Sequence, residues 1–116
     1  MTLPHDDGYQ DLRDAIRDLC ADYPDAYWRE VDARRGYPEA FVDALTRGGW
    51  LAALIPREYG GSGLGLAEAS VIMEEINRNG GNAGACHGQM YNMGTLLRHG
   101  SDEQKRRYLP KIASGE

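Results

Sequence analysis

Apolar residues recur at helical spacing along most of the chain, and the first such segment begins close to the N-terminus. Its apolar side chains fall three and four residues apart, which places them on one face of a helix. The charged residues between them, Arg13 and Arg17 included, are expected to face water. Pro24 predicts the end of this helix near Tyr23, because the residue before a proline avoids the helical region. The apolar face consists of Tyr9, Leu12, Ile16, Leu19 and Cys20.

Two shorter helices are expected next. Asp25 is a suitable N-cap for the second helix, and Gly36 is expected to end it. Pro38 suits the first position of the third helix, because its fixed backbone angle is already helical. Gly48 and Gly49 are expected to end that helix. The buried faces of the two helices are predicted to carry Tyr27, Trp28, Val31, Phe41, Val42 and Leu45.

The middle of the chain contains a short apolar run followed by a glycine-rich segment. The run from Trp50 to Ile55 suits either a helical turn or a buried extended piece. Residues 56–65 are predicted to form a loop, since four glycines within residues 60–65 permit backbone conformations that other residues resist. A phosphate-binding loop is disfavoured here, because no strand precedes the glycines and their spacing matches no nucleotide-binding motif.

The fourth and fifth helices are expected over residues 66–79 and about 83–99. Each glycine inside a helix costs up to about 1 kcal/mol relative to alanine. Two such glycines on one face of the fifth helix therefore predict either a close helix–helix contact or space for a ligand. The fourth helix is expected to bury Ala69, Ile72, Met73 and Ile76. In the fifth, the apolar seam is Ala83, Cys86, Met90, Met93 and Leu97, and the second face carries Gly84, His87, Gly88, Tyr91 and Thr95.

A sixth helix is expected after Gly100. Ser101 and Gln104 have the spacing of a capping box, and a break is predicted at Leu109–Pro110. No segment alternates well enough to predict a long strand. The predicted fold is therefore all-α: a single domain over residues 1–116, an orthogonal or up-down bundle of about five to six helices, with residues 1–8 as a flexible terminus.

Composition narrows the classes of function. The 116 residues carry a net charge of −5, which argues against nucleic acid as a partner because phosphate binding needs a cationic face. The longest apolar run is too short to cross a membrane and no export signal is recognisable, so no membrane is expected and the predicted location is cytoplasmic. Cys20 and Cys86 are expected to be buried thiols rather than a disulfide or a metal site.

No complete active site is evident from the residues. The histidines, His5, His87 and His99, lack the spacing of metal ligands, and His87 is expected to be a partly buried, hydrogen-bonded side chain. Glu74 and Glu75 are adjacent, so their side chains are expected to point in different directions and not to form a catalytic pair. No nucleophile–base pair is present either. We therefore predict a helical domain with no catalytic residue and no metal site of its own.

Two stretches resemble acyl-CoA dehydrogenases. The segment from Gly49 to Gly63 is similar to the family's G-x-x-x-x-x-x-P-x-x-x-G-G-x-G pattern. The segment from Gly100 to Pro110 closely resembles the family's G-[ST]-x-E-Q-K-x-x-Y-L-P pattern, and Ala-Ser-Gly-Glu follows at residues 113–116. Both occur in the family's order, and the likeness extends from about Leu12 to the last residue. The chain is thus identified as similar to the N-terminal α-helical domain of these flavoenzymes.

The resemblance implies a substrate, a cofactor and further domains. In the family, a β-domain and a C-terminal helical domain follow and hold most of the FAD site. A glutamate base removes the α-proton of the acyl thioester, and the flavin accepts the β-hydride. The resemblance therefore implies an acyl-CoA or related acyl thioester as substrate and FAD as the cofactor of the parent protein. The 116-residue chain is expected to be inactive by itself, and a homo-oligomer is expected.

The resemblance also implies where the acyl group lies. Aligned back from Gly100, the family's acyl-lining positions on the fifth helix correspond here to Ala83, Gly84, His87, Gly88 and Tyr91. The glycines would leave volume for the acyl chain. His87 and Tyr91 are bulky and polar at the deep end of the expected pocket, so a short, branched or polar acyl group is expected rather than a long straight chain.

Two alternatives remain open. The same helical domain occurs in related flavin monooxygenases and nitroalkane oxidases, whose chemistry differs. An alternative of another class is a stand-alone helical module that self-associates through an apolar face and needs no flavin. If the acyl-CoA dehydrogenase interpretation holds, surfaces that meet further domains are exposed in this chain. The isolated chain is then expected to dimerise or aggregate.

Overall fold

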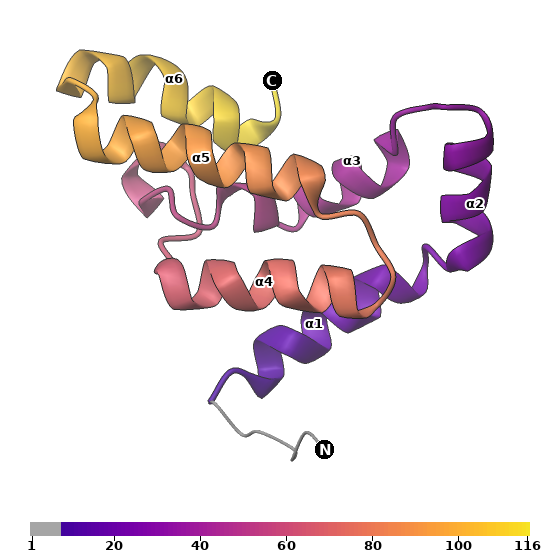
Figure 1. Cartoon of the computed structure of the whole chain (residues 1–116). Coiled ribbons are helices and arrows are strands. Elements are labelled where there is room, and N and C mark those ends of the chain that lie inside the picture. The colour runs from indigo at the N-terminus through magenta and orange to yellow at the C-terminus, as the bar shows by residue number, and fades with distance from the viewer. Residues whose placement is uncertain (1–7) are drawn as a thin grey trace.

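The computed structural model describes residues 8–116, which form six α-helices and no strand (Figure 1). The predicted all-α fold is therefore confirmed for these residues. Most of the predicted flexible terminus, residues 1–7, lies outside the described part. The helices are α1 (Gln10–Ala21), α2 (Asp25–Ala33), α3 (Glu39–Arg47), α4 (Leu66–Arg78), α5 (Gly84–His99) and α6 (Asp102–Ser114).

The last three helices form the frame of the molecule. Helices α4, α5 and α6 run in alternating directions, so consecutive helices are antiparallel, and α1 packs against α4 (Figure 1). Two short 3-10 turns, Trp50–Ala52 and Arg57–Tyr59, connect α3 to α4. The first turn packs against α5 and both turns pack against α6. The body is flattened, with extents of 43 × 38 × 20 Å, so each helix of the frame keeps an exposed side.

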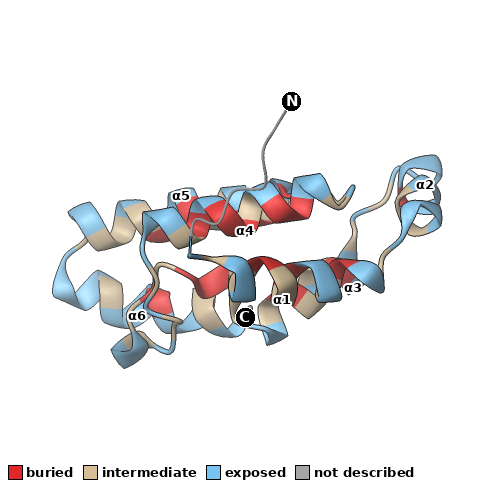
Figure 2. Cartoon of the chain, turned by 90° about the horizontal axis from the view of Figure 1, so that it is seen from below, coloured by how far each residue is buried: buried red, intermediate tan, exposed pale blue. Residues whose placement is uncertain are grey.

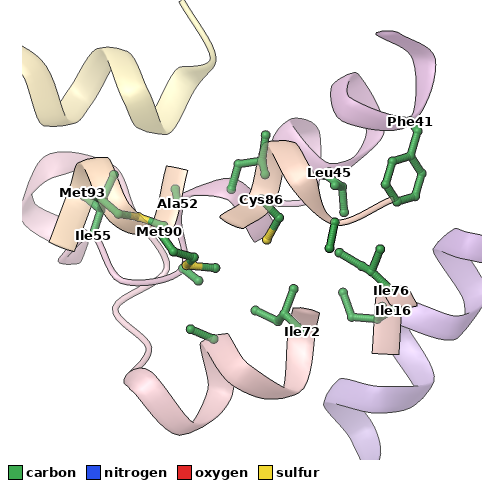
Figure 3. Packing of buried hydrophobic residues seen from close by; sticks show 14 of the residues in the cluster. Ile16, Phe41, Leu45, Ala52, Ile55, Ile72, Ile76, Cys86, Met90 and Met93 are labelled. Carbon is green, nitrogen blue, oxygen red and sulfur yellow. The ribbon is translucent and has the colours of Figure 1, made fainter. Parts of the chain in front are cut away.

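The core lies where α1, α3, α4 and α5 meet the apolar run at residues 50–55 (Figure 3). The predicted seam of α5 is confirmed at four positions that are buried and at Leu97, which packs against the core. The run from Trp50 to Ile55, for which two conformations were open, forms a 3-10 turn followed by further turns, and it is largely buried. Figure 2 shows that buried residues concentrate on the facing sides of these helices and that their outer sides are exposed.

The predicted break at Leu109–Pro110 is wrong, because α6 continues to Ser114 with Pro110 inside it. A proline leaves the carbonyl four residues earlier, that of Arg106, without its helical N–H donor. Both Arg106 and Pro110 are exposed, so water can hydrate that carbonyl. Leu109 is fully buried and Ile112 packs against the core, so tertiary contacts hold the helix on both sides of the proline.

The ends of α2 also differ from the prediction. Pro24 occupies the N-cap position that was expected for Asp25, and Asp25 begins the helix instead. An acidic residue in the first turn still interacts favourably with the helix dipole. The helix ends at Ala33, and Arg35 rather than Gly36 takes the left-handed conformation, with φ of 50°. The predicted capping box of α6 is confirmed: Ser101 and Gln104 each accept a hydrogen bond from the other's backbone N–H.

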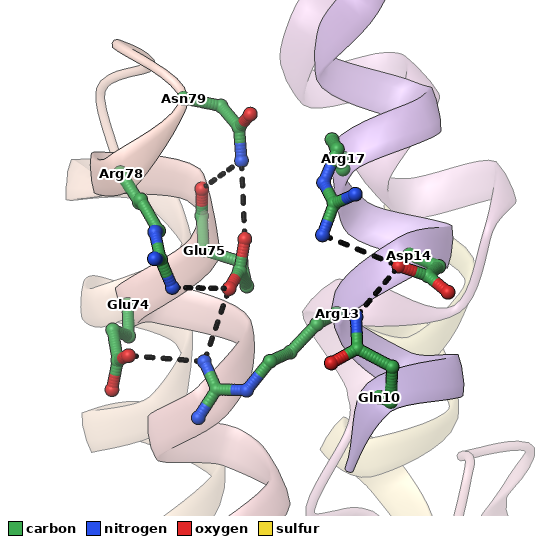
Figure 4. A network of polar contacts seen from close by, with 8 residues as sticks. All are labelled: Gln10, Arg13, Asp14, Arg17, Glu74, Glu75, Arg78 and Asn79. Carbon is green, nitrogen blue, oxygen red and sulfur yellow. Dashed lines mark hydrogen bonds and ion pairs between the residues drawn. The ribbon is translucent and has the colours of Figure 1, made fainter. Parts of the chain in front are cut away.

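Arg13 does not face water as the sequence predicted, but lies buried between α1 and α4 (Figure 4). Its Nη1 donates to Glu74 Oε1 at 3.0 Å and to Glu75 Oε1 at 3.1 Å. Asn79 Nδ2 also donates to Glu75, at 3.2 Å to Oε2. The adjacent carboxylates, expected to point apart, thus meet at one guanidinium. Because a buried carboxylate requires a charged or hydrogen-bonding partner, the packing of α1 on α4 draws Arg13 inward.

Candidate functional site

A groove of about 540 Å³ lies between α4 and α5. Each helix contributes side chains three or four residues apart, which is the spacing of one helix face. The groove is lined by Leu54, Leu66, Ala69, Ser70, Met73, His87, Met90, Tyr91, Gly94, Thr95, Arg98 and His99. It is a candidate binding site because it is concave, largely apolar and carries a few polar groups.

Two of the predicted site residues, His87 and Tyr91, meet in this groove. They lie one turn apart on α5, with ring centroids 4.5 Å apart and an interplanar angle of 62°, an edge-to-face contact. Tyr91 is 65% exposed. His87 is exposed as well, whereas the sequence favoured a partly buried histidine. Both rings are therefore accessible to a ligand.

The other three predicted residues do not line the groove. Ala83 is buried in the core, at the start of α5. At Gly84 an added Cβ would approach only Asn82, whose Oδ1 accepts a hydrogen bond from the Gly84 N–H. At Gly88 an added Cβ would meet nothing within 4 Å. A close helix–helix contact therefore explains neither glycine, and the second explanation, space for a ligand, stays a prediction.

The groove differs from one end to the other. Helices α4 and α5 are antiparallel, so Met73 lies toward the His87 end, whereas Leu66 lies toward the end formed by Arg98 and His99. Apolar side chains dominate the lining between the two ends. The sequence did not predict that α4 contributes to the site, because Ala69 and Met73 were interpreted only as core residues. Arg98 follows Tyr91 by two turns on the same face of α5. This spacing could have predicted that Arg98 lines the other end of the groove.

The two cysteines are free and buried, as the sequence predicted. Burial raises the pKa of the Cys86 thiol to about 11. Burial, and then the negative charge of Glu75, raise the pKa of Cys20. Both are therefore unreactive thiols at neutral pH. Within residues 8–116, no three His, Cys, Asp or Glu side chains are grouped so that they could hold a metal ion, and none of the helices described is long and apolar enough to span a bilayer.

Comparison with known proteins points to one family. Residues 6–116 match the sequence profile described as "Acyl-CoA dehydrogenase, N-terminal domain". The chain is 31% identical over 119 residues to mitochondrial isovaleryl-CoA dehydrogenase of Solanum tuberosum, covering 99% of this chain and 29% of that protein. It is 34% identical to the same enzyme of Bos taurus over 109 residues, covering 90% and 26%. It is 33% identical to a probable acyl-CoA dehydrogenase, fadE25, of Mycobacterium leprae, covering 91% and 28%. The chain thus spans less than a third of the length of these relatives.

Proposed function

Because the chain belongs to the acyl-CoA dehydrogenase family, as an N-terminal domain, we propose that α5 forms part of the acyl-thioester pocket of an FAD-dependent dehydrogenase. The observation that carries this proposal is the groove beside α5. Its lining is mainly apolar, and its wall carries His87 and Tyr91, two of the positions that the family resemblance assigns to the acyl group. Apolar surface removed from water contributes about 25 cal/mol per Å², so this lining favours a hydrocarbon chain.

We propose that the acyl group is short, branched or polar. The edge-to-face pair of His87 and Tyr91 occupies one end of the groove and leaves polar ring atoms there. A long straight hydrocarbon chain would have to pass these rings, whereas a short chain would end beside them. Two of the relatives above are named for isovaleryl-CoA, a thioester of a short branched acid, which agrees with this proposal.

The glycine-rich loop at residues 60–65 does not fit FAD. The glycine-rich loop would be the natural place for its pyrophosphate, but the loop amides are already engaged. The backbone N–H groups of residues 61–64 donate to carbonyls of the preceding turn at 2.7–3.1 Å; the acceptors are Pro56, Ala52, Ile55 and Ala53. We therefore propose that other domains of the parent protein hold most of the FAD, whose chemistry is to accept a hydride from the acyl chain. No residue of this chain is proposed as catalytic, and the chain alone is proposed to be inactive.

The experiment that tests this function is a chain-length profile of the complete protein. His87→Ala removes one of the rings at the end of the groove. We expect kcat/KM for longer straight acyl-CoA substrates to rise, relative to short ones, by on the order of tenfold, since each extra methylene in an apolar pocket is worth about 10-fold or more. Asn92→Ala is the matched control, because Asn92 is exposed on α5 outside the groove. A profile unchanged by His87→Ala would contradict the proposal.

No observation favours the two alternative functions. The relatives reported above are named as dehydrogenases, not as monooxygenases or nitroalkane oxidases. The family match covers nearly the whole chain. It therefore gives no support to the other alternative, a stand-alone self-association module without flavin.

A further inference from the structure

Asn79 has a sequence context that makes its side-chain amide chemically labile. Among the asparagines of the chain, only Asn79 is followed by glycine. Asparagine amides are thermally labile groups. Loss of the amide begins when the backbone nitrogen of the next residue reaches Cγ, and Gly80 has no side chain to hinder that approach. Gly80 also has a φ of 80°, which favours glycine, so the turn after α4 requires the residue that makes Asn79 labile.

The folded protein holds this amide in place at the end of α4 (Figure 4). Nδ2 of Asn79 donates to the backbone carbonyl of Glu75 at 2.7 Å and to the Glu75 Oε2 at 3.2 Å. The attacking nitrogen is engaged as well, because the Gly80 N–H donates to the Asn77 carbonyl at 3.1 Å. Both groups must leave these partners before they can react. The amide of Asn79 is therefore protected while the last turn of α4 is intact.

Helix α1 covers the residue that binds the amide. The Glu75 side chain is 1% exposed, and its Oε1 lies 3.1 Å from Nη1 of Arg13 on α1. Helix α1 is the first of the described helices and makes its main packing contact with α4. A helix that is held mainly by one neighbour can leave by local unfolding while the rest of the core stays folded. When α1 leaves, Glu75 becomes exposed to water and the last turn of α4 can fray.

We propose that Asn79 is a deamidation site that opens when α1 leaves α4, and that the product weakens the return of α1. The Gly80 nitrogen bonds to Cγ of Asn79, and its proton goes with the amide nitrogen, which leaves as ammonia when the Cγ–Nδ2 bond breaks. Water then opens the resulting succinimide ring at either carbonyl and gives aspartate or isoaspartate. Water is consumed, ammonia is released, and nothing is oxidised or reduced. This inference goes beyond the proposed function and does not depend on it.

The product places a negative charge where the folded protein has a hydrogen-bond donor. Arg13 and Arg78 both pair with Glu75. Arg13 also pairs with Glu74, so two guanidinium groups meet two carboxylates. Deamidation adds a further carboxylate at the position of Nδ2, 3.2 Å from Oε2 of Glu75. Like charges repel most strongly where water is excluded, and both hydrogen bonds from Nδ2 are lost, so the packing of α1 on α4 becomes less stable.

The first test measures the rate of amide loss in the complete protein. The protein is incubated at mildly alkaline pH and digested, and the conversion of each asparagine is followed by mass spectrometry. Arg13→Met should speed the conversion of Asn79 by about tenfold or more, because a buried ion pair that loses one partner opens more often. Asn92 is exposed but is followed by Met93, so its conversion should stay slower than that of Asn79.

Leu109→Ala is the matched control for Arg13→Met. Leu109 is fully buried on α6, which packs against α3, α5 and the two 3-10 turns. Its truncation costs at least as much stability as the loss of Arg13 does, but it acts far from α1. Leu109→Ala should therefore speed the conversion of Asn79 less than Arg13→Met does. Equal or greater acceleration by Leu109→Ala would show that only global unfolding exposes the amide.

The second test concerns the product and does not require Arg13→Met to fold. Asn79→Asp carries the charge of the product, whereas Asn79→Ala loses the same hydrogen bonds without adding a charge. Amide hydrogen exchange of α1, measured by mass spectrometry, should be about tenfold faster in Asn79→Asp than in Asn79→Ala, because only the former places a carboxylate beside Glu75.

Three results would each overturn the inference. In the urea-unfolded protein, Asn79 might be converted no faster than Asn92; Leu109→Ala might speed conversion as much as Arg13→Met; or the two Asn79 variants might exchange the α1 amides at equal rates. Faster conversion in Arg13→Met than in Leu109→Ala, together with faster exchange of α1 in Asn79→Asp, supports it. None of these measurements involves an acyl thioester, so the proposed acyl pocket stands or fails separately.

Discussion

Nη1 of Arg13 lies 3.1 Å from Oε1 of Glu75, and this contact joins α1 to α4 inside the protein (Figure 4). The Glu75 side chain is only 1% exposed, so its charge depends on Arg13, on Arg78 at 3.5 Å and on the hydrogen bond from Asn79. Since α4 also forms one wall of the groove, the pair helps to hold that wall in place. It is the most deeply buried ion pair among the described residues.

We predict that Arg13→Met destabilises the protein by about 2 kcal/mol or more, because it removes the nearer of the two guanidinium groups that pair with the buried Glu75 carboxylate and leaves only Arg78, at 3.5 Å. Urea unfolding would measure the loss in the free energy of unfolding. The control is Arg17→Ala, which removes the ion pair of Arg17 with Asp14, two side chains that are each at least 50% exposed. This variant should lose less than about 1 kcal/mol of unfolding free energy. The double variant Arg13→Met/Glu75→Leu should recover much of the lost stability. If Arg13→Met lost no more unfolding free energy than Arg17→Ala, the Arg13–Glu75 pair would not stabilise the protein as a buried ion pair does.

Gly88 and Gly61 are predicted to respond in opposite ways to alanine. Gly88→Ala should stabilise the protein by up to about 1 kcal/mol, because the helix gains propensity and the new Cβ meets nothing within 4 Å. Gly61→Ala should destabilise it, since the added Cβ would overlap the backbone of Ile55. Thermal unfolding of the two variants would contradict this account if Gly88→Ala lowered stability or if Gly61→Ala left it unchanged.

The sequence predicted the helices well because their apolar periodicity is strong, and it failed where tertiary contacts outweigh local preference. Pro110 favours a break, yet Leu109 is anchored in the core, and Arg106, whose carbonyl loses its N–H donor, is an exposed residue. Arg13 belongs to the polar pattern of α1, yet it is buried because it pairs with Glu75 on a helix more than sixty residues away in sequence. A pattern within one helix carries no information about such a distant partner.

Only part of the candidate site could be predicted in the same way. The face of α5 that carries His87 and Tyr91 follows from spacing and from the family resemblance, and the structure brings these two rings together. The role of α4 requires knowing which helices pack side by side. Ala83 illustrates the remaining ambiguity: its spacing assigns it to the apolar seam, the family resemblance assigns it to the acyl group, and its burial places it in the core.

The free energy of unfolding should depend on pH in the alkaline range because of Cys86. Burial raises the pKa of this thiol from 9.0 to about 11, so the folded protein keeps the proton that the unfolded chain loses first. Stability should be unaffected by this group below about pH 8.5 and should fall as the pH rises from about 9 to about 11, by on the order of 1–3 kcal/mol. Urea unfolding at several pH values would measure the slope. Cys86→Ala should reduce this slope, and the remaining part includes the contribution of Cys20, whose pKa is also raised; an equal slope in that variant would assign the effect to other groups.

The isolated chain is predicted to self-associate through the groove. Leu66 is 73% exposed and Tyr91 is 65% exposed, and both line it, so a large apolar surface faces water. Tyr91→Ser should weaken association by removing part of this surface. Tyr37→Ser is the control, because Tyr37 is 55% exposed but lies outside the groove. Sedimentation velocity at high concentration would measure the association, and a clean monomer of the unsubstituted chain would contradict the prediction.

The most direct test of the proposed acyl site is photoaffinity labelling of the complete protein. An acyl-CoA with a diazirine at the end of a short acyl chain would be bound, irradiated and digested, and the labelled peptides identified by mass spectrometry. We predict labels within residues 84–99 of α5 or on the facing residues 66–73 of α4, suppressed by an excess of isovaleryl-CoA. If every label that isovaleryl-CoA suppresses lay outside these two segments, the acyl group would not occupy the groove and the account would be wrong.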